Sequence, residues 1–210
     1  MELSADLLLH AYASGVFPMA ETRDSDGVFW VDPKFRGILP LDRFHISKSL
    51  AKRIRKGAHK IRINSDFTAV VEGCADREET WINDEIFDRY LELHTLGFAH
   101  SLEVWDGQDL VGGVYGVSLG GAFFGESMFS RRTDASKIAL AYLIDRLRIS
   151  GFGLCDTQFI TPHLASLGGE EISREEYRHR LTDALQMEGD FLRPDIPCPQ
   201  ALLQRSSQTS

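Results

Sequence analysis

The chain has 210 residues, of which 43% are apolar, so it is long enough to bury one good hydrophobic core. It contains no run of about 18 apolar residues, and acidic residues occupy the positions near its start where a secretory signal would carry positive charge. A net charge of −8 opposes nucleic-acid binding unless positive charge is gathered in one region. We therefore expect a cytoplasmic protein, with no membrane association, built around one catalytic domain.

The cysteines indicate neither a disulfide framework nor a zinc site. There are three of them, Cys74, Cys155 and Cys198, an odd number with no C-x-x-C spacing. We therefore expect reduced thiols, no metal and no cofactor.

The start of the chain predicts a small lobe. Ser4 to Ala13 has the periodicity of an amphipathic helix with Ser4 as its N-cap, and an acidic loop follows over 21–27. We place the N-terminal lobe at residues 1–37 and the catalytic domain at residues 38–210. The tail after about residue 194 is expected to be mobile.

One stretch concentrates positive charge. Between Arg43 and Arg62 there are eight Lys or Arg residues and no Asp or Glu, whereas the rest of the chain is acidic. Ser47 is suited to be the N-cap of a helix there, and four of the cations then share one helical face. A solvated helix surface is the alternative interpretation, but one-sided charge without counter-charge favours a phosphate-binding face. The candidate phosphate-binding residues are Lys48, Lys52, Arg53, Arg55 and Lys56.

The middle of the chain predicts both helices and strands. Ser65 or Asp66 is suited to cap a helix that Gly73 ends, and Asn83 is suited to cap a longer helix. Asp-Gly and Gly-Gly turns join three strand-like segments into an antiparallel meander. The expected strands are 38–41, 60–64, 100–105, 110–119 and 122–128, and the expected helices are 66–72, 83–96 and 173–186.

A crossover follows the meander. Residues 134–150 have a helical pattern with Asp134 as N-cap, and residues 153–160 are typical of a strand that returns beside the last meander strand. In such a unit the strand ends and the helix start face one crevice, so a site is expected there. The polar residues expected to meet in it are Glu126, Ser127, Ser130, Asp156 and Gln158.

The same stretch carries a family resemblance. GESMFSR (125–131), a helix beginning DASK (134–137) and a D-x-Q strand (156–158) followed by HLASLGG (163–169) together resemble the leucyl/phenylalanyl-tRNA–protein transferases. Further matching segments cover roughly residues 3 to 190. They include YASGVFP (12–18), FHISKS (44–49), VEGC (71–74), TWI (80–82) and HSLEVW (100–105).

The resemblance implies a cytoplasmic enzyme that moves Leu or Phe from aminoacyl-tRNA to the α-amino group of proteins beginning with Arg or Lys, marking them for degradation. It implies a GNAT-like α+β fold, a mixed sheet with flanking helices. It also implies that Asp156 and Gln158 are the catalytic pair and that Trp81 and Tyr90 lie near the tRNA 3′ adenosine, where aromatic stacking is apt. Tyr12, in the first matching segment, joins the candidate substrate-binding residues. The basic stretch becomes the candidate tRNA-binding face.

The chemistry of the site residues can be weighed separately from the resemblance. Asp156 and Gln158 lie two apart on a strand and so point to one face. A neutral amide is a weak base, so we expect Gln158 to orient the attacking amine, with Asp156 fixing Gln158 or holding the ammonium. Glu126 could receive a guanidinium or ammonium group, or could pair with Arg131 or Arg132. Met128 suits a pocket for the Leu or Phe side chain and suits core packing equally well.

Two rival functions stay open. The order of the expected elements also fits a CoA-dependent GNAT N-acetyltransferase, although the loop before the crossover helix lacks the glycines of a pyrophosphate turn. A non-catalytic module that binds basic N-termini would need the same acidic pocket.

Overall fold

A seven-stranded mixed sheet organises the structure, which is a computed structural model describing residues 3–25 and 27–207. The strand order is β4-β5-β6-β7-β8-β3-β9, and every neighbouring pair is antiparallel except β7 and β8. The strands are β3 (Phe35–Ile38), β4 (Lys60–Ile63), β5 (Ala99–Asp106), β6 (Asp109–Leu119), β7 (Ala122–Ser130), β8 (Leu154–Gln158) and β9 (Glu170–Ser173). The expected mixed sheet with flanking helices is confirmed.

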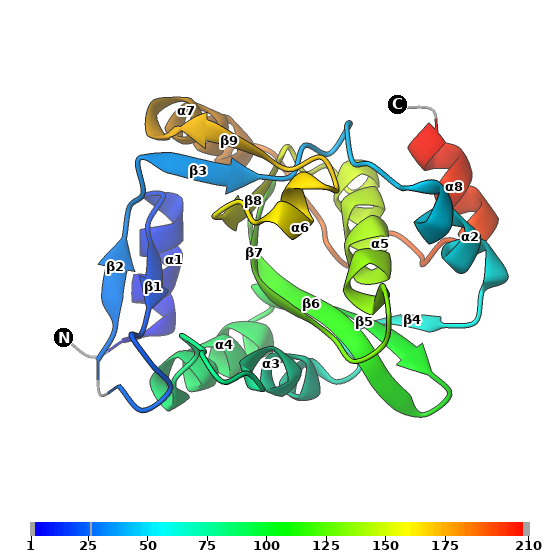
Figure 1. Cartoon of the computed structure of the whole chain (residues 1–210). Coiled ribbons are helices and arrows are strands. Elements are labelled where there is room, and N and C mark those ends of the chain that lie inside the picture. Colours follow the sequence, from blue (N-terminus) through cyan, green and yellow to red (C-terminus); the bar gives the residue numbers. More distant parts are fainter. Residues whose placement is uncertain (1–2, 26, 208–210) are drawn as a thin grey trace.

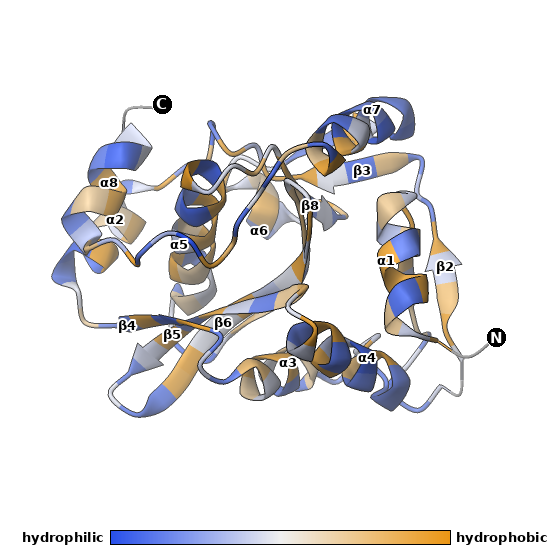
Figure 2. Ribbon diagram, turned by 180° about the vertical axis from the view of Figure 1, so that it is seen from behind, coloured by the Kyte–Doolittle hydropathy of each residue, from blue (hydrophilic) through white to orange (hydrophobic). Residues whose placement is uncertain are grey.

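Helices cover both faces of this sheet. They are α1 (Ala5–Ala13), α2 (Lys48–Lys56), α3 (Phe67–Ala75), α4 (Asp84–Thr95), α5 (Ala135–Ile149), α6 (Pro162–Ala165), α7 (Arg174–Leu185) and α8 (Pro199–Ser207). One apolar cluster joins α1, α3, α4 and α7 to one face of the sheet, and a second joins α2, α5, α6 and α8 to the other. Both views place α3 and α4 across β5 and β6 from α5 (Figures 1 and 2).

The N-terminal part is a helix and a hairpin. Ser4 caps α1 as expected, its side chain accepting a hydrogen bond from the backbone N–H of Leu7. Two short strands that the sequence pattern does not indicate follow, β1 (Phe17–Met19) and β2 (Phe29–Val31), and they pair only with each other. The chain then enters the main sheet through β3.

The crossover helix α5 is confirmed, but its predicted cap is wrong. Asp134 has a left-handed backbone (φ 65°) and makes no cap hydrogen bond, because its carboxylate pairs instead with Arg53 at 3.0 Å. The hydroxyl of Ser130 takes the capping role by accepting the backbone N–H of Ser136 at 3.2 Å. The helix is buried nearly all round, since it lies between the sheet and the pair α2–α8, and its buried residues include Asp145 and Arg146 as well as apolar side chains.

Two further expectations differ from the structure. The helix expected to end at Gly73 continues to Ala75, and Gly73 is needed there because an added Cβ would lie 3.0 Å from the ring of Phe129. Residues 199–207, in the part of the chain expected to be mobile, form α8. Leu202 of that helix is buried, and Arg205 makes two hydrogen bonds to the Asp145 carboxylate of α5.

No helix in the described part of the chain combines the length and the hydropathy that a membrane crossing requires. The hydropathy colouring agrees, because the long helix α7 shows a largely hydrophilic outer side (Figure 2).

Candidate active site

The two parallel strands at the centre of the sheet separate before they end. β7 and β8 pair over three residues, the last pair being Phe124 and Asp156, yet β7 continues to Ser130 and β8 to Gln158. Beyond this last pair the strands diverge, and a cavity of about 240 Å³ lies between them. Cavities of this kind are the default binding sites of proteins, so this is the candidate active site.

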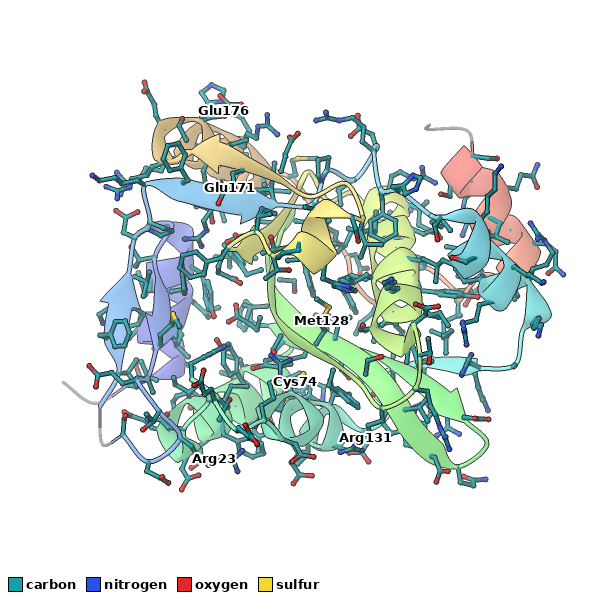
Figure 3. All side chains as sticks on the ribbon, viewed as in Figure 1. Arg23, Cys74, Met128, Arg131, Glu171 and Glu176 are labelled. Carbon is teal, nitrogen blue, oxygen red and sulfur yellow. The ribbon has the colours of Figure 1, made fainter. Side chains whose placement is uncertain are left out.

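The wall of the cavity is mainly apolar, with a few polar groups. The β1–β2 hairpin, the α3–α4 loop, β7, β8, α5 and α6 all contribute to it. Lining residues on which the argument depends are Met19, Arg77, Trp81, Glu126, Met128, Thr157 and Gln158. Figure 3 shows Met128 on the side of β7 that faces α6. The hydroxyl of Thr157 is buried with no hydrogen-bond partner among the described residues, so the wall has an unused polar group.

Asp156 is fully buried and its carboxylate is fully engaged. Oδ1 accepts hydrogen bonds from Arg36 Nε at 2.9 Å and from the backbone N–H of Gln158 at 2.8 Å. Oδ2 accepts from Arg36 Nη2 at 2.6 Å and from the Tyr177 hydroxyl at 2.9 Å. The Arg36 guanidinium carbon lies 4.5 Å from the ring centres of both Phe17 and Tyr177. Asp156 therefore fixes Gln158 through the backbone N–H of that residue, and it does not line the cavity.

Gln158 ends β8 in an unusual backbone conformation. Its φ is 58°, in the left-handed region that costs a non-glycine residue energy, and the hydrogen bond from its N–H to Asp156 stabilises this turn. The strict alternation of strand faces therefore stops before Gln158. Its side chain lines the cavity, where Nε2 lies 3.5 Å from Glu126 Oε1, the long limit of a hydrogen bond.

Two tyrosine hydroxyls form a chain of hydrogen bonds that ends at Glu126. The hydroxyl of Tyr90 donates to Glu126 Oε2 at 2.6 Å, and the hydroxyls of Tyr90 and Tyr12 are 2.7 Å apart. Burial raises the pKa of Glu126 to about 7, opposed by hydrogen bonds from these tyrosines; Asp156 raises it further and Arg36 lowers it. Glu126 therefore changes charge near neutral pH. Glu126 does not form the alternative ion pair with Arg131 or Arg132.

The burial of the two tyrosines changes their expected role. Tyr12 and Tyr90 are both 0% exposed, so neither ring has a face open to a base. Of the two aromatic residues expected beside an adenosine, only Trp81 lines the cavity. Ser130 is exposed and caps α5, as described above, so it lies at the rim and not among the polar groups of the cavity.

The basic stretch forms α2, capped by Ser47 as expected. Lys48, Lys52, Arg55 and Lys56 are exposed, whereas Arg53 is half-buried and pairs with Asp134. The helix buries only Leu50 and Ile54. It lies against α5 and α8 (Figure 1). Its exposed cations lie on the side away from the buried Leu50 and Ile54.

Three residues of the site are absent from the sequence-based prediction. Arg36 lies in β3 and Tyr177 lies in α7, and neither element carries a local sequence signal for a site. Arg77 lies in the loop between α3 and α4. A buried arginine can be inferred only when its carboxylate partner is known, and Asp156 is 120 residues away in the chain.

Comparison with known proteins gives consistent results. A family model described as leucyl/phenylalanyl-tRNA protein transferase matches residues 38–182, and one for the N-terminal domain of that transferase matches residues 1–34. A protein named leucyl/phenylalanyl-tRNA–protein transferase from Ruegeria sp. TM1040 is 74% identical over the full length of both chains. Proteins of the same name from Cereibacter sphaeroides KD131 and Ruegeria pomeroyi are 63% and 60% identical, over 98% or more of each chain.

Among solved structures, a C-terminal domain from Agrobacterium fabrum, provisionally named a lysylphosphatidylglycerol synthetase, covers 89% of this chain and 60% of its own. Its sequence identity to this chain is 10% and the TM-score is 0.40.

Proposed function

The chain belongs to the leucyl/phenylalanyl-tRNA–protein transferase family, and from that premise we propose that its aminoacyl transfer takes place in the cavity between β7 and β8. The observation that supports this location is the convergence of Glu126 and Gln158 on an otherwise apolar cavity at the point where two parallel strands separate. The Leu or Phe side chain occupies the apolar wall near Met128, and the ester lies beside Gln158.

The proposed reaction needs little chemistry from the protein. The acceptor's α-amino nitrogen attacks the ester carbonyl carbon, the C–O bond to the terminal ribose of the tRNA breaks, and one proton passes from the amine to that ribose oxygen. Because the ester is already activated, orientation supplies most of the acceleration. Gln158 accepts a hydrogen bond from the amine through its amide oxygen, while its amide nitrogen faces Glu126. Asp156 and Arg36 are positioning residues that fix the backbone of Gln158.

Glu126 selects acceptor proteins whose first residue is basic. A buried carboxylate beside the amine site is suited to a guanidinium or ammonium group, and bidentate pairing favours Arg over Lys. We therefore propose that the acceptors begin with Arg or Lys. We also propose that the reaction takes place in the cytoplasm.

The proposal extends to the fold. A parallel strand pair that separates, joined by one crossover helix, supports a GNAT-like catalytic domain of residues 38–210 behind a lobe of residues 1–37. The loop from Arg131 to Asp134 has no glycine and ends in a carboxylate, which disfavours CoA pyrophosphate as a ligand.

One experiment separates this function from its rivals. The protein is incubated with a casein-derived peptide beginning with Arg and, in parallel, with Phe-tRNA, Leu-tRNA or acetyl-CoA, and the peptide is analysed by mass spectrometry. We expect Phe or Leu on the α-amine. Acetylation would establish the CoA enzyme, and peptide binding without any addition would establish a binding module.

Replacing Glu126 by Gln should raise the apparent KM for an Arg-starting acceptor about tenfold or more at pH 8, because a charge-assisted contact is lost. In the parent this KM should fall as pH rises through about 7, where Glu126 ionises. In the variant the change near pH 7 should be lost, and only the titration of the acceptor's own α-amine should remain. An increase confined to the aminoacyl-tRNA KM would assign Glu126 to the other substrate.

Stability provides an independent check on the charge state of Glu126. Its pKa in the folded protein, about 7, lies above its ordinary value of 4.5, so the unfolded chain loses the proton first. The free energy of unfolding should therefore fall between those two pH values by at most about 3 kcal/mol. Glu126→Gln should abolish this part of the pH dependence in urea unfolding.

Charge removal on α2 tests the tRNA face. Replacing Lys52, Arg55 and Lys56 by Gln should weaken tRNA binding and reduce the slope of log affinity against log salt by about 3, if each contacts one phosphate. Replacing Lys34, an exposed lysine on the loop before β3, is the control and should leave the slope unchanged. Equal slopes in all three proteins would make α2 an ordinary solvated surface.

A further inference from the structure

A second cavity adjoins the first. Its volume is about 390 Å³, and it lies where the end of α3, the outer end of β7 and the start of α5 meet. Arg77 and Met128 line both cavities. The Nη2 of Arg77 donates to the backbone carbonyl of Met128 and lies 3.4 Å from the Ser127 hydroxyl. The two spaces are therefore separated by little more than one side chain, so a ligand in the first can extend into the second.

The chemistry of the second cavity differs from that of the first. Its polar lining is dominated by hydrogen-bond donors: Arg77, Arg131, Ser130, Ser136 and His163. The Nε2 of His163 is buried with no hydrogen-bond partner among the described residues. The carboxylate of Asp76 also lines the cavity, but it is 79% exposed and 3.9 Å from Arg131, so it neutralises little of this charge. Paired arginines with hydroxyls suit a phosphate group.

The location of this cavity extends the positive face of α2 toward the reacting groups. Arg53 of α2 reaches Asp134, which follows the Arg131–Arg132 pair by two residues. Arg131 lies at the outer end of β7 near α3, with its guanidinium over the ring of Phe129 (Figure 3). The Arg53–Asp134 ion pair thus connects α2 to the loop that carries Arg131, and Arg77 lies at the mouth of the first cavity.

We propose that the second cavity binds a phosphodiester group of the single-stranded 3′ end of the tRNA while the amino acid occupies the first cavity. The inference rests on the proposed function, because it assigns a second part of the same substrate. Arg131 and Arg77 contact the phosphate oxygens. Binding there fixes the ester bond at the boundary of the two cavities, beside Glu126 and Gln158.

The test uses two small donors that differ by one phosphodiester: the phenylalanyl ester of adenosine and the phenylalanyl ester of cytidylyl-(3′→5′)-adenosine. The quantity measured is the ratio of kcat/KM for the second donor to that for the first, with an Arg-starting peptide as acceptor. The parent should prefer the dinucleotide. Arg131→Gln should reduce this preference about tenfold, as expected for loss of a charge-assisted contact. Arg132→Gln, the same change at an exposed neighbour that does not line the cavity, is the matched control and should keep the parent ratio.

The outcomes distinguish this inference from the proposed function. Transfer by the parent with no preference for the dinucleotide, or an equal loss of preference in both variants, would overturn the phosphate site and leave the proposed function intact. Failure of the parent to transfer Phe from either donor or from Phe-tRNA would remove both. Because Arg131 is exposed, its variant should unfold at the parent's temperature, and this is checked in parallel.

Discussion

Asp156→Asn should lower the free energy of unfolding by about 3–5 kcal/mol, because it removes the only carboxylate that pairs with a fully buried guanidinium among the described residues. Arg36 is 1% exposed and is covered by the rings of Phe17 and Tyr177, so water replaces the lost carboxylate poorly. The amide of Asn would also turn an N–H group toward the donors that surround this position. Urea unfolding at pH 7 measures the change.

A double variant isolates the ion pair. Arg36→Met with Asp156→Asn should be less destabilised than the sum of the two single variants, because the uncompensated charge is gone. A loss below about 1 kcal/mol for Asp156→Asn, or strict additivity, would show that the pair does not anchor the strand. Asp156→Asn therefore keeps the shape of the side chain but lowers the stability of the protein. The activity of this variant must be compared with that of the parent per folded molecule.

Gln158→Ala should reduce the single-turnover rate of peptide-bond formation about 10²-fold while both substrates still bind. The lost interaction exists mainly in the transition state, where the amide oxygen orients the attacking amine. Rapid quench with saturating Phe-tRNA and acceptor peptide measures this rate without product release.

The backbone of residue 158 requires a control. Its φ of 58° suits glycine better than alanine, so Gln158→Gly removes the side chain while relieving strain. Equal rate losses in the Ala and Gly variants would assign the effect to the amide. A near-normal rate in both would leave the ribose of the tRNA and the backbone at residues 125–130 to carry the reaction.

The sequence predicts the framework well because periodicity and caps are local. The helices capped by Ser4, Ser47, Asn83 and Ser173 begin where expected, and the meander and crossover have the expected order. Local reasoning fails where a distant group competes for a side chain. Asp134 is a good capping residue by type, but Arg53 attracts its carboxylate.

The sequence predicts the convergence of Glu126 and Gln158 more accurately than the geometry of the residues around them. The residues of the crossover unit do converge, since Gln158 lies 3.5 Å from Glu126. The roles of Asp156 and of the two tyrosines depend on burial, which the sequence does not specify. By its position on an amphipathic helix Tyr90 would ordinarily be a core residue, the family resemblance favours a stacking role, and its full burial decides for the core.

The contribution of the N-terminal hairpin to the candidate site also depends on tertiary structure. Arg36 links β3, the hairpin ring of Phe17 and the carbonyl of Gly15 to Asp156. Residues 15 and 17 therefore contribute to the rigidity of Gln158, and Phe17 also contributes to the cavity wall. This connection predicts that changes in the hairpin near Phe17 alter the chemical step, and not only substrate affinity.

The central claim is that the amino acid to be transferred lies in the cavity between β7 and β8. The most direct measurement charges tRNA with 4-azidophenylalanine, irradiates its complex with the protein, and maps the crosslinked residues by mass spectrometry. The account predicts adducts at Met128 and the adjoining walls from β8 and α5, and competition by Phe-tRNA should suppress them. Adducts confined to the exposed aromatic residues of β2 or to α2, with none in this cavity, would contradict it.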